Sequence, residues 1–213
     1  MSEAPAFDAK FHRSFCDLLA WRRDVRRFRT NSPPEGTLER LFALASLAPS
    51  VGLSQPWRFV VVDNRERRAA IRADFERCNQ EALSDYSGAR ARLYATLKLA
   101  GLDAAPIQFG VFADRDATQG HGLGRRTMPE TTEYSAVMAV HTLWLAARVE
   151  GLGLGWISIL DPSRVAEILE IPSTWRFIGY FCLGYPEQTD HTPALERAGW
   201  EERRSSAEFI LRR

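Results

Sequence analysis

The chain alternates between segments with a helical spacing of apolar residues and short runs of β-branched and aromatic residues. Residues 7–21 carry apolar side chains three and four positions apart, at Phe11, Phe15, Leu18 and Leu19, which is the spacing of an amphipathic helix. The same spacing, with capping residues and glycine or proline stops, predicts further helices. We expect them over residues 37–47, 65–82, 89–102, 131–150 and 161–169, with 131–150 the longest. The last begins with Asp161 as its N-cap and Pro162 at the first helical position.

Short apolar runs between these helices are typical of buried β-strands. We expect strands over residues 57–62, 106–112, 156–159 and 175–183. The apolar tail residues 209–211 are expected to form an edge strand that can pair with a second copy of the chain. The glycine-rich, polar residues 114–130 predict a mobile loop. Because the helices are grouped between strands without regular βαβ alternation, the predicted fold class is α+β.

The composition is that of one ordinary globular domain. The chain has 213 residues, of which 45% are hydrophobic and 26% charged, and no segment has the composition of a linker. We therefore expect a single domain over residues 1–213. A formal net charge of +1 argues against a protein held to nucleic acid by bulk electrostatics. No apolar run approaches the ~18 residues of a membrane span, so we expect no membrane contact.

Several common sites are excluded by spacing. The three cysteines lie far apart without a Cys-x-x-Cys pair, which is typical of reduced thiols in a cytoplasmic protein. The four histidines have no metal-ligand spacing with one another or with cysteine, so we predict no metal site. The glycine-rich residues 151–155 follow a predicted helix and precede a predicted strand, the reverse of a dinucleotide-binding fingerprint.

The segment from Trp21 to Phe28 is the most informative part of the chain. Five of the eight positions 22–29 are arginine, and Asp24 is the only carboxylate among them. Arginine's planar fork of donors matches the oxygens of a phosphate. The flanking Arg23 and Arg26 predict an ionised Asp24 with a pKa below its usual range, able to act as an acceptor or a base. The alternative is a helix end whose cations complement the helix dipole and its C-terminal carbonyls.

Three segments together resemble the FMN-dependent nitroreductase superfamily. Residues 22–28, Arg-Arg-Asp-Val-Arg-Arg-Phe, are similar to its Arg-Arg-Ser-x-Arg-x-Phe signature. Residues 48–57, Ala-Pro-Ser-Val-Gly-Leu-Ser-Gln-Pro-Trp, resemble the stretch Ala-Pro-Ser-x-x-Asn-x-Gln-Pro-Trp that runs along the flavin. Residues 151–158, Gly-Leu-Gly-Leu-Gly-Trp-Ile-Ser, resemble the late Gly-Leu-Gly segment whose backbone approaches the flavin ring.

Two departures from the superfamily pattern narrow the resemblance. Asp24 stands where most members carry Ser, and Leu53 stands where flavin reductases commonly carry Asn. The exchange at Asp24 matches the branch that consumes its flavin, the 5,6-dimethylbenzimidazole synthases of vitamin B12 biosynthesis. Residues 97–102 also resemble this branch, in a segment that covers the flavin. Ser158 falls where the branch is expected to have a catalytic serine.

The resemblance implies a nitroreductase-like fold with a mixed central sheet flanked by helices. Two chains are expected to exchange terminal segments in a homodimer and to hold FMN at their interface. Reduced FMN would be the substrate and dioxygen the co-substrate, with no metal, and the products would be 5,6-dimethylbenzimidazole and erythrose 4-phosphate. A separate flavin reductase would supply reduced FMN.

The resemblance also assigns site residues, with Asp24 as a base near the ribityl carbon next to N10 and Ser158 as a hydroxyl near N5 and C4a. The expected FMN contacts are Arg22, Arg23, Asp24, Val25, Arg26, Ser50, Leu99, Ser158, Arg203 and Arg204. Two other functions stay open. One is an NAD(P)H-dependent flavin reductase or nitroreductase, against which Asp24 and Leu53 count, and the other is a non-catalytic FMN-binding carrier. From the residues alone, Ser50 fits an ST-turn equally well.

Overall fold

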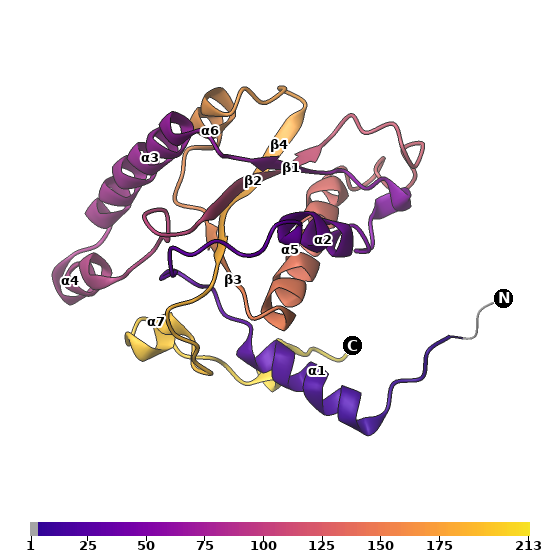
Figure 1. Cartoon of the computed structure of the whole chain (residues 1–213), viewed down its shortest axis with the longest axis horizontal. Helices are drawn as coiled ribbons and strands as arrows, with labels where there is room; N and C mark the ends of the chain where they lie inside the picture. Colours follow the sequence, from indigo (N-terminus) through magenta and orange to yellow (C-terminus); the bar gives the residue numbers. More distant parts are fainter. Residues whose placement is uncertain (1–3) are drawn as a thin grey trace.

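The computed structural model describes residues 4–213, which form a four-stranded sheet with helices on both faces (Figure 1). The strands are β1 (Trp57–Val61), β2 (Ile107–Asp114), β3 (Gly153–Ile157) and β4 (Trp175–Gly184). Their order is β1-β2-β4-β3, and each neighbouring pair is antiparallel. The predicted α+β class is confirmed. The resemblance implied a mixed sheet, with parallel as well as antiparallel pairs. Among the described residues, the parallel pairing is limited to an isolated bridge between Asp24 and Leu154.

Helices α2 (Thr37–Ala45) and α5 (Thr131–Val149) cover one face of the sheet. The buried positions of α5 recur at three and four residues, so one stripe of the helix faces the strands. This stripe packs with Leu41 of α2 against Phe109 and Phe181 of the central strands. Its apolar members are Ala136, Ala139, Val140, Leu143, Trp144 and Ala147.

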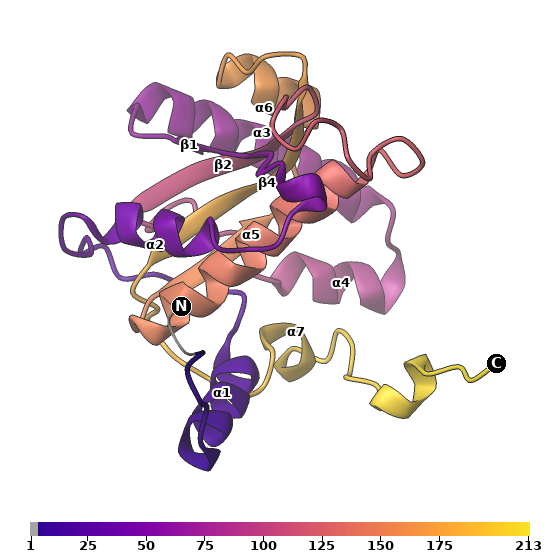
Figure 2. The same cartoon turned by 90° about the vertical axis from the view of Figure 1, so that its right-hand side faces the viewer.

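Helices α3 (Arg65–Ser84) and α6 (Pro162–Ile168) cover the opposite face (Figure 2). The predicted N-cap of α6 is confirmed, because the Asp161 side chain accepts hydrogen bonds from the backbone N–H groups of Ser163 and Arg164. With 20 residues α3 is longer than α5, which has 19, so the prediction that residues 131–150 form the longest helix is wrong.

Two predicted boundaries are wrong because tertiary contacts override local pattern. The helix predicted over residues 89–102 ends early, as α4 (Gly88–Thr96), where Leu97 adopts extended backbone. The following residues then turn inward and bury Ala100 and Leu102. The strand predicted over residues 156–159 begins three residues earlier, within the glycine-rich stretch.

The chain ends lie outside the layers of the sheet (Figures 1 and 2). Helix α1 (Ala9–Trp21) forms as predicted and is capped by Asp8, but it buries none of its residues. After β4 come α7 (Ala194–Arg197) and the 3-10 helix η2 (Ser206–Phe209). Residues 209–211 pair with no strand of this chain and are exposed. Among the described residues no helix is long and apolar enough to cross a membrane.

Candidate functional site

The arginine segment leaves the end of α1 and runs along the free edge of β3. The Val25 N–H donates to the carbonyl of Leu154 at 3.0 Å, which fixes the register of the segment against the strand. Gly153 and Gly155 make this approach possible, because a Cβ at either position would collide with Val25. The glycines that resemble a flavin-binding segment are therefore needed first for contact with residues 24–26.

Phe28 anchors the far end of the same segment. Its side chain is 1% exposed and belongs to the core between the sheet and α3. Gly101 lies directly against the ring, since a Cβ there would overlap it, and a Cβ at Gly184 would lie 3.4 Å from the ring. Phe28 therefore joins the arginine segment to the end of β4 and to the stretch that follows α4.

Asp24 is held by two fixed partners. Its Oδ1 accepts a hydrogen bond from the Trp156 N–H at 2.9 Å, and its Oδ2 pairs with Nε of Arg26 at 2.8 Å. Burial raises the pKa of Asp24, while Arg26 and the Trp156 amide oppose that rise. The predicted lowering of this pKa is therefore wrong. The sequence showed the flanking charges but not the loss of water that comes with packing against β3.

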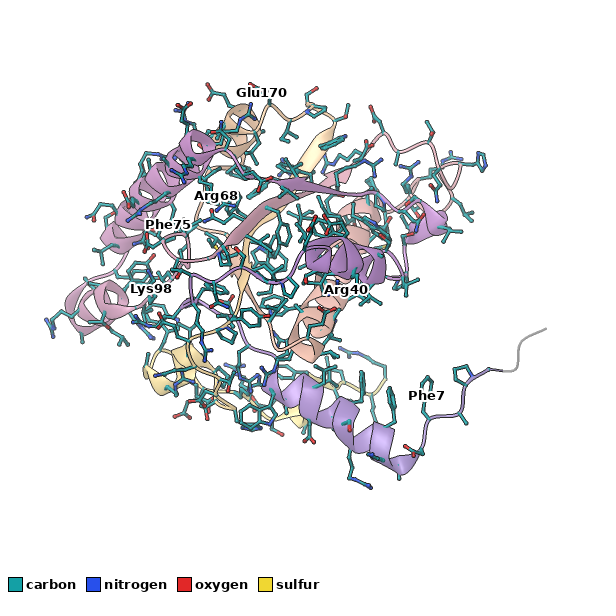
Figure 3. All side chains as sticks on the ribbon, in the orientation of Figure 1. Phe7, Arg40, Arg68, Phe75, Lys98 and Glu170 are labelled. Atoms are coloured by element: carbon teal, nitrogen blue, oxygen red, sulfur yellow. The ribbon has the colours of Figure 1, made fainter. Side chains whose placement is uncertain are left out.

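Arg26 connects Asp24 with the stretch that follows α4. In addition to its pairing with Asp24, its Nη1 donates to the carbonyl of Lys98 at 3.2 Å. Figure 3 shows Lys98 close to the end of α4, on the side of the C-terminal segment. Arg26 thus ties a carboxylate on one side of a cleft to backbone on the other side.

Arg22, Arg23 and Arg203 form a group of neighbouring cations. Burial and then the like charge of Arg203 lower the pKa of both Arg22 and Arg23. The Arg22 guanidinium also lies over the ring of Trp144, 5.0 Å from its centroid. Such a group is unfavourable by itself and favours an anion with more than one negative charge, such as a phosphate ester.

Arg23 also bonds the end of helix α1, as in the alternative in which the cations of this segment complement C-terminal helix carbonyls. Its guanidinium donates to the carbonyl of Ala20 in the last turn of α1, and to the carbonyls of Arg22 and His191. Its Nε atom is buried without a hydrogen-bond partner among the described residues. An unpaired buried donor beside other cations is an observation that fits a bound anion.

A cleft of about 250 Å³ opens beside these residues. It lies between residues 23–27, the end of α4 with Lys98, and the loop that carries α7. Val25, one of the expected FMN contacts, is among the residues that line it. Sequence analysis missed the contribution of residues 188–198, where no motif marked the chain. Their members at the cleft are Gln188, Asp190, Thr192, Ala194, Leu195, Arg197 and Ala198.

The remaining predicted residues lie at different distances from this cleft. Ser158 is exposed directly after β3, two positions beyond Trp156, so strand geometry places it roughly 7 Å along the edge from the residue that binds Asp24. Leu99 is half-buried and lines a separate cavity of about 140 Å³ beside α3. Arg204 is exposed.

Ser50 is not brought to the cleft within one chain. It precedes β1, at the opposite edge of the sheet from β3, and strand spacing alone separates the two edges by roughly 14 Å. Its hydroxyl accepts a hydrogen bond from the Gln55 N–H at 3.1 Å, five positions later, which is not the bond to the second following residue that an ST-turn would make. Within residues 4–213, no three His, Cys, Asp or Glu side chains gather as a metal site would require.

Comparison with known proteins identifies the family. The sequence profile of the nitroreductase family matches residues 19–185. A 5,6-dimethylbenzimidazole synthase of Rhodospirillum rubrum is 53% identical over 204 residues, covering 96% of this chain and 97% of that protein. Another, from Rhodobacter capsulatus, is 49% identical over 196 residues, 92% of this chain and 95% of the relative.

Solved structures agree on the fold. Oxidised iodotyrosine deiodinase bound to FMN and 3-iodo-L-tyrosine superposes with a TM-score of 0.69 at 27% identity, covering 82% of this chain and 91% of that chain. A nitroreductase family protein of Streptococcus pneumoniae gives a TM-score of 0.65 at 21% identity, over 93% of this chain and 100% of its own. The chain belongs to the nitroreductase family, in its 5,6-dimethylbenzimidazole synthase branch.

Proposed function

We propose that this chain is a 5,6-dimethylbenzimidazole synthase that consumes reduced FMN and dioxygen, with erythrose 4-phosphate as the second product. The observation that carries the proposal is Asp24, a partly buried carboxylate fixed between the Trp156 amide and Arg26 at the wall of the cleft. A flavin that is only stored or recycled has no use for a base there. Relatives at 45–53% identity bear the name of this activity, which supports the assignment.

The phosphate of FMN fits the cation group of Arg22, Arg23 and Arg203. Charge-assisted bonds from guanidinium to phosphate are strong, and the buried Nε of Arg23 would gain an acceptor. The rest of the molecule would then extend along Asp24, Val25 and Arg26. Among the predicted contacts, Arg26 would act from the arginine segment, Leu99 from the stretch after α4, and Arg204 at the outer rim.

When bound, reduced FMN supplies the electrons that reduce dioxygen. Asp24 would remove the proton from the ribityl carbon next to N10, and its raised pKa suits a base that works near neutral pH. Ser158, further along the β3 edge, would place its hydroxyl near N5 and C4a and relay a proton there. The stretch after α4, tied to Arg26 through the Lys98 carbonyl, would keep water from the ring.

A second copy of the chain would complete the site. Ser50 lies at the sheet edge opposite the cleft, so one chain alone does not supply both groups. Large apolar side chains are exposed on α1, on α5 and in the C-terminal tail, which is typical of a surface covered by a partner. We therefore propose a homodimer with exchanged terminal segments. The exposed residues are Phe11, Phe15, Leu19, Val137, Met138, Phe209, Ile210 and Leu211.

The second candidate function is an NAD(P)H-dependent flavin reductase. The fold favours this function, because iodotyrosine deiodinase bound to FMN has the same fold. A protein with this fold can therefore bind FMN without cleaving it. Anaerobic incubation of the FMN-loaded protein with excess NADPH distinguishes the two functions. Rapid bleaching of the yellow flavin supports the reductase, whereas a synthase depends on a separate reductase and stays yellow. A non-catalytic carrier would also stay yellow but would give no product from reduced FMN.

The direct test is aerobic incubation with reduced FMN, followed by mass spectrometry for 5,6-dimethylbenzimidazole. Wild-type protein should form it. Asp24→Asn keeps the shape but removes the base, so product formation should fall by about 100- to 10,000-fold while reduced FMN still binds. Asp63→Asn is the control, because that carboxylate is exposed, pairs among the described residues only with Arg68 at 3.9 Å and does not line the cleft. Product at the wild-type rate from Asp24→Asn would exclude Asp24 as the base.

The pH dependence tests the pairing of Arg26 with Asp24. Burial raises the pKa of Asp24 and Arg26 lowers it, so Arg26→Met should raise this pKa further. The base would then stay protonated to a higher pH, and the acid limb of the pH–rate profile should move to higher pH. Arg72→Met, which removes a cation paired with Glu76 and Asp103, should leave the limb in place. An unmoved limb in Arg26→Met would contradict the pairing.

Affinity for FMN tests the cation group. Arg22→Ala and Arg203→Ala should each weaken the binding of oxidised FMN by about 1.5–3 kcal/mol, the scale of a hydrogen bond to a charged group. Quenching of flavin fluorescence measures this. Arg29→Ala is the matched control, since Arg29 belongs to the same arginine run but its side chain is exposed and lies outside the cleft. If all three variants bind FMN with equal affinity, the cation group does not bind the phosphate of FMN.

Assembly is tested by sedimentation and by mixing variants. The protein should sediment as a dimer. If each cleft combines Asp24 of one chain with Ser50 of the other, refolding Asp24→Asn together with Ser50→Ala should restore about a quarter of wild-type activity, since half of the dimers are mixed and one of their two sites is intact. Binding of FMN by a monomer with wild-type affinity would refute the shared site.

A further inference from the structure

A β-bulge in β4 brings two consecutive residues to the same face of the sheet. Val111 of β2 lies opposite Gly179. The next residue, Phe112, lies opposite Phe177, so Ile178 has no partner in β2. Phe177 packs on the α3 side of the sheet, whereas Ile178 packs on the α5 side. Bulges redirect side chains in this way and are frequent beside functional sites.

The indole of Trp156 occupies the space that a side chain at Gly179 would fill. A Cβ on Gly179 would lie 2.1 Å from Nε1 of Trp156 and 2.8 Å from two further atoms of the same ring. The φ of Gly179 lies outside the left-handed region, so the backbone itself does not require glycine. The close approach of the indole requires it, because only a residue without a Cβ leaves enough room.

The same indole packs in a row of aromatic rings. Its centroid lies 5.0 Å from that of Phe181, also on β4, and 6.4 Å from that of Trp144 on α5. Trp144 in turn donates its indole N–H to the Arg23 carbonyl at 3.0 Å. The backbone N–H of Trp156 donates to the carboxylate of Asp24. Two neighbouring tryptophans therefore bond consecutive residues of the arginine segment.

We infer that Gly179 is a positioning residue, because it seats the Trp156 indole on β4 and thereby holds the Trp156 amide against the carboxylate of Asp24. This inference rests on the proposed function. Because β3 is an edge strand, β4 is its only neighbour in the sheet. A methyl group at residue 179 would push the indole, and the β3 backbone with it, away from its seat. The bond to Asp24 would then weaken, since hydrogen bonds depend steeply on distance and angle.

Loss of this bond has two consequences for Asp24. The Trp156 amide opposes the burial that raises the pKa of Asp24, so without it the pKa should rise further. The carboxylate would also be less well aimed, and a misplacement of about 1 Å can cost about 100-fold in rate. The other titratable or charged groups around Asp24 lie on its own segment, on β4, after α4 and in the loop that carries α7. They are Arg22, Arg26, Cys182, Lys98, Asp190 and Arg197.

The experiment compares Gly179→Ala with the double variant Gly179→Ala, Trp156→Leu. Leucine takes the indole away from the added methyl group but keeps the backbone amide. Gly110→Ala is the matched control, because a Cβ on this glycine of β2 would lie 2.9 Å from the Phe112 ring, on the other face of the sheet.

Three quantities are measured for each protein. The first is the pKa of the Asp24 carboxyl in the flavin-free protein, followed by NMR with isotope-labelled aspartate and assigned with Asp24→Asn. The second is the rate of benzimidazole formation from reduced FMN, and the third is the Tm.

Gly179→Ala should raise the pKa of Asp24 and lower the rate of benzimidazole formation about 100-fold. The double variant should return both quantities toward their wild-type values. Gly110→Ala should lower the Tm, as Gly179→Ala does, because each crowds an aromatic ring in a packed core. It should leave the pKa of Asp24 and the rate unchanged, which separates positioning from general destabilisation.

Three results would overturn the inference. An unchanged pKa of Asp24 in Gly179→Ala would show that the indole moves without its backbone. A pKa that stays raised in the double variant would show that the indole is not the link. If neither variant folds, the clash with the indole is not what the glycine avoids.

The proposed function can fail separately. If wild-type protein forms no benzimidazole, Asp24 has no role as the base of that reaction. The NMR titration needs neither flavin nor turnover, so it still decides whether Gly179 positions Asp24.

Discussion

Burial of the Phe28 ring against glycines positions the whole candidate site. The ring is in the core. Gly101 can lie against it because it has no Cβ, and Gly184, far away in sequence, lies beside it at the end of β4. This contact fixes one end of the arginine segment, and the Val25–Leu154 hydrogen bond fixes its middle. Asp24, between α1 and these two anchors, therefore has little freedom to move away from Trp156.

The same anchoring explains the electrostatics of the site. Packing against β3 removes water from Asp24, which disfavours its charge, while Arg26 and the Trp156 amide favour it. These opposing effects leave a carboxylate that is easier to protonate than an exposed one and yet rigidly held. For Arg22 and Arg23, burial and the repulsion from Arg203 both lower the pKa, so both disfavour the charged guanidinium. A bound anion would stabilise these two cations, whereas it would repel the carboxylate of Asp24. One short segment thus carries a carboxylate whose charge is disfavoured by burial and cations that favour a neighbouring negative charge.

The sequence predicted the features that depend on local chemistry. The N-cap at Asp161, the helical stripe of α5 and the arginine run at the end of α1 all depend on residues close together in the chain. Wrong predictions came from contacts between distant residues. The helix after Gly88 stops at Thr96 and the chain then turns inward to bury Ala100 and Leu102, while β3 starts at Gly153, where Val25 of the distant arginine segment packs.

The site itself shows the same division. Composition marked the cationic segment, but the rise in the pKa of Asp24 depends on its burial against a strand edge, where its partner Trp156 lies 132 positions later in the chain. No local pattern contains that contact. Similarly, no motif marks residues 188–198, and only the folded chain brings their side chains to the wall of the cleft. Sequence reasoning therefore finds reactive side chains more readily than the surfaces that enclose them.

The two edges of the sheet carry parts that are rigid for different reasons. At the β3 edge, core packing of Phe28 fixes the segment that carries Asp24. At the β1 edge, hydrogen bonds from Gln119 to the Leu53 carbonyl and from the Val51 N–H to the Ser135 hydroxyl fix residues 50–55. Neither part depends on the other for its shape, so two chains can meet with both halves of a site already formed. Such preorganisation matters for a reaction whose competitor, release of peroxide, needs no precise geometry. A site assembled from flexible loops would favour the competitor, so the rigidity of both sheet edges fits the proposed reaction.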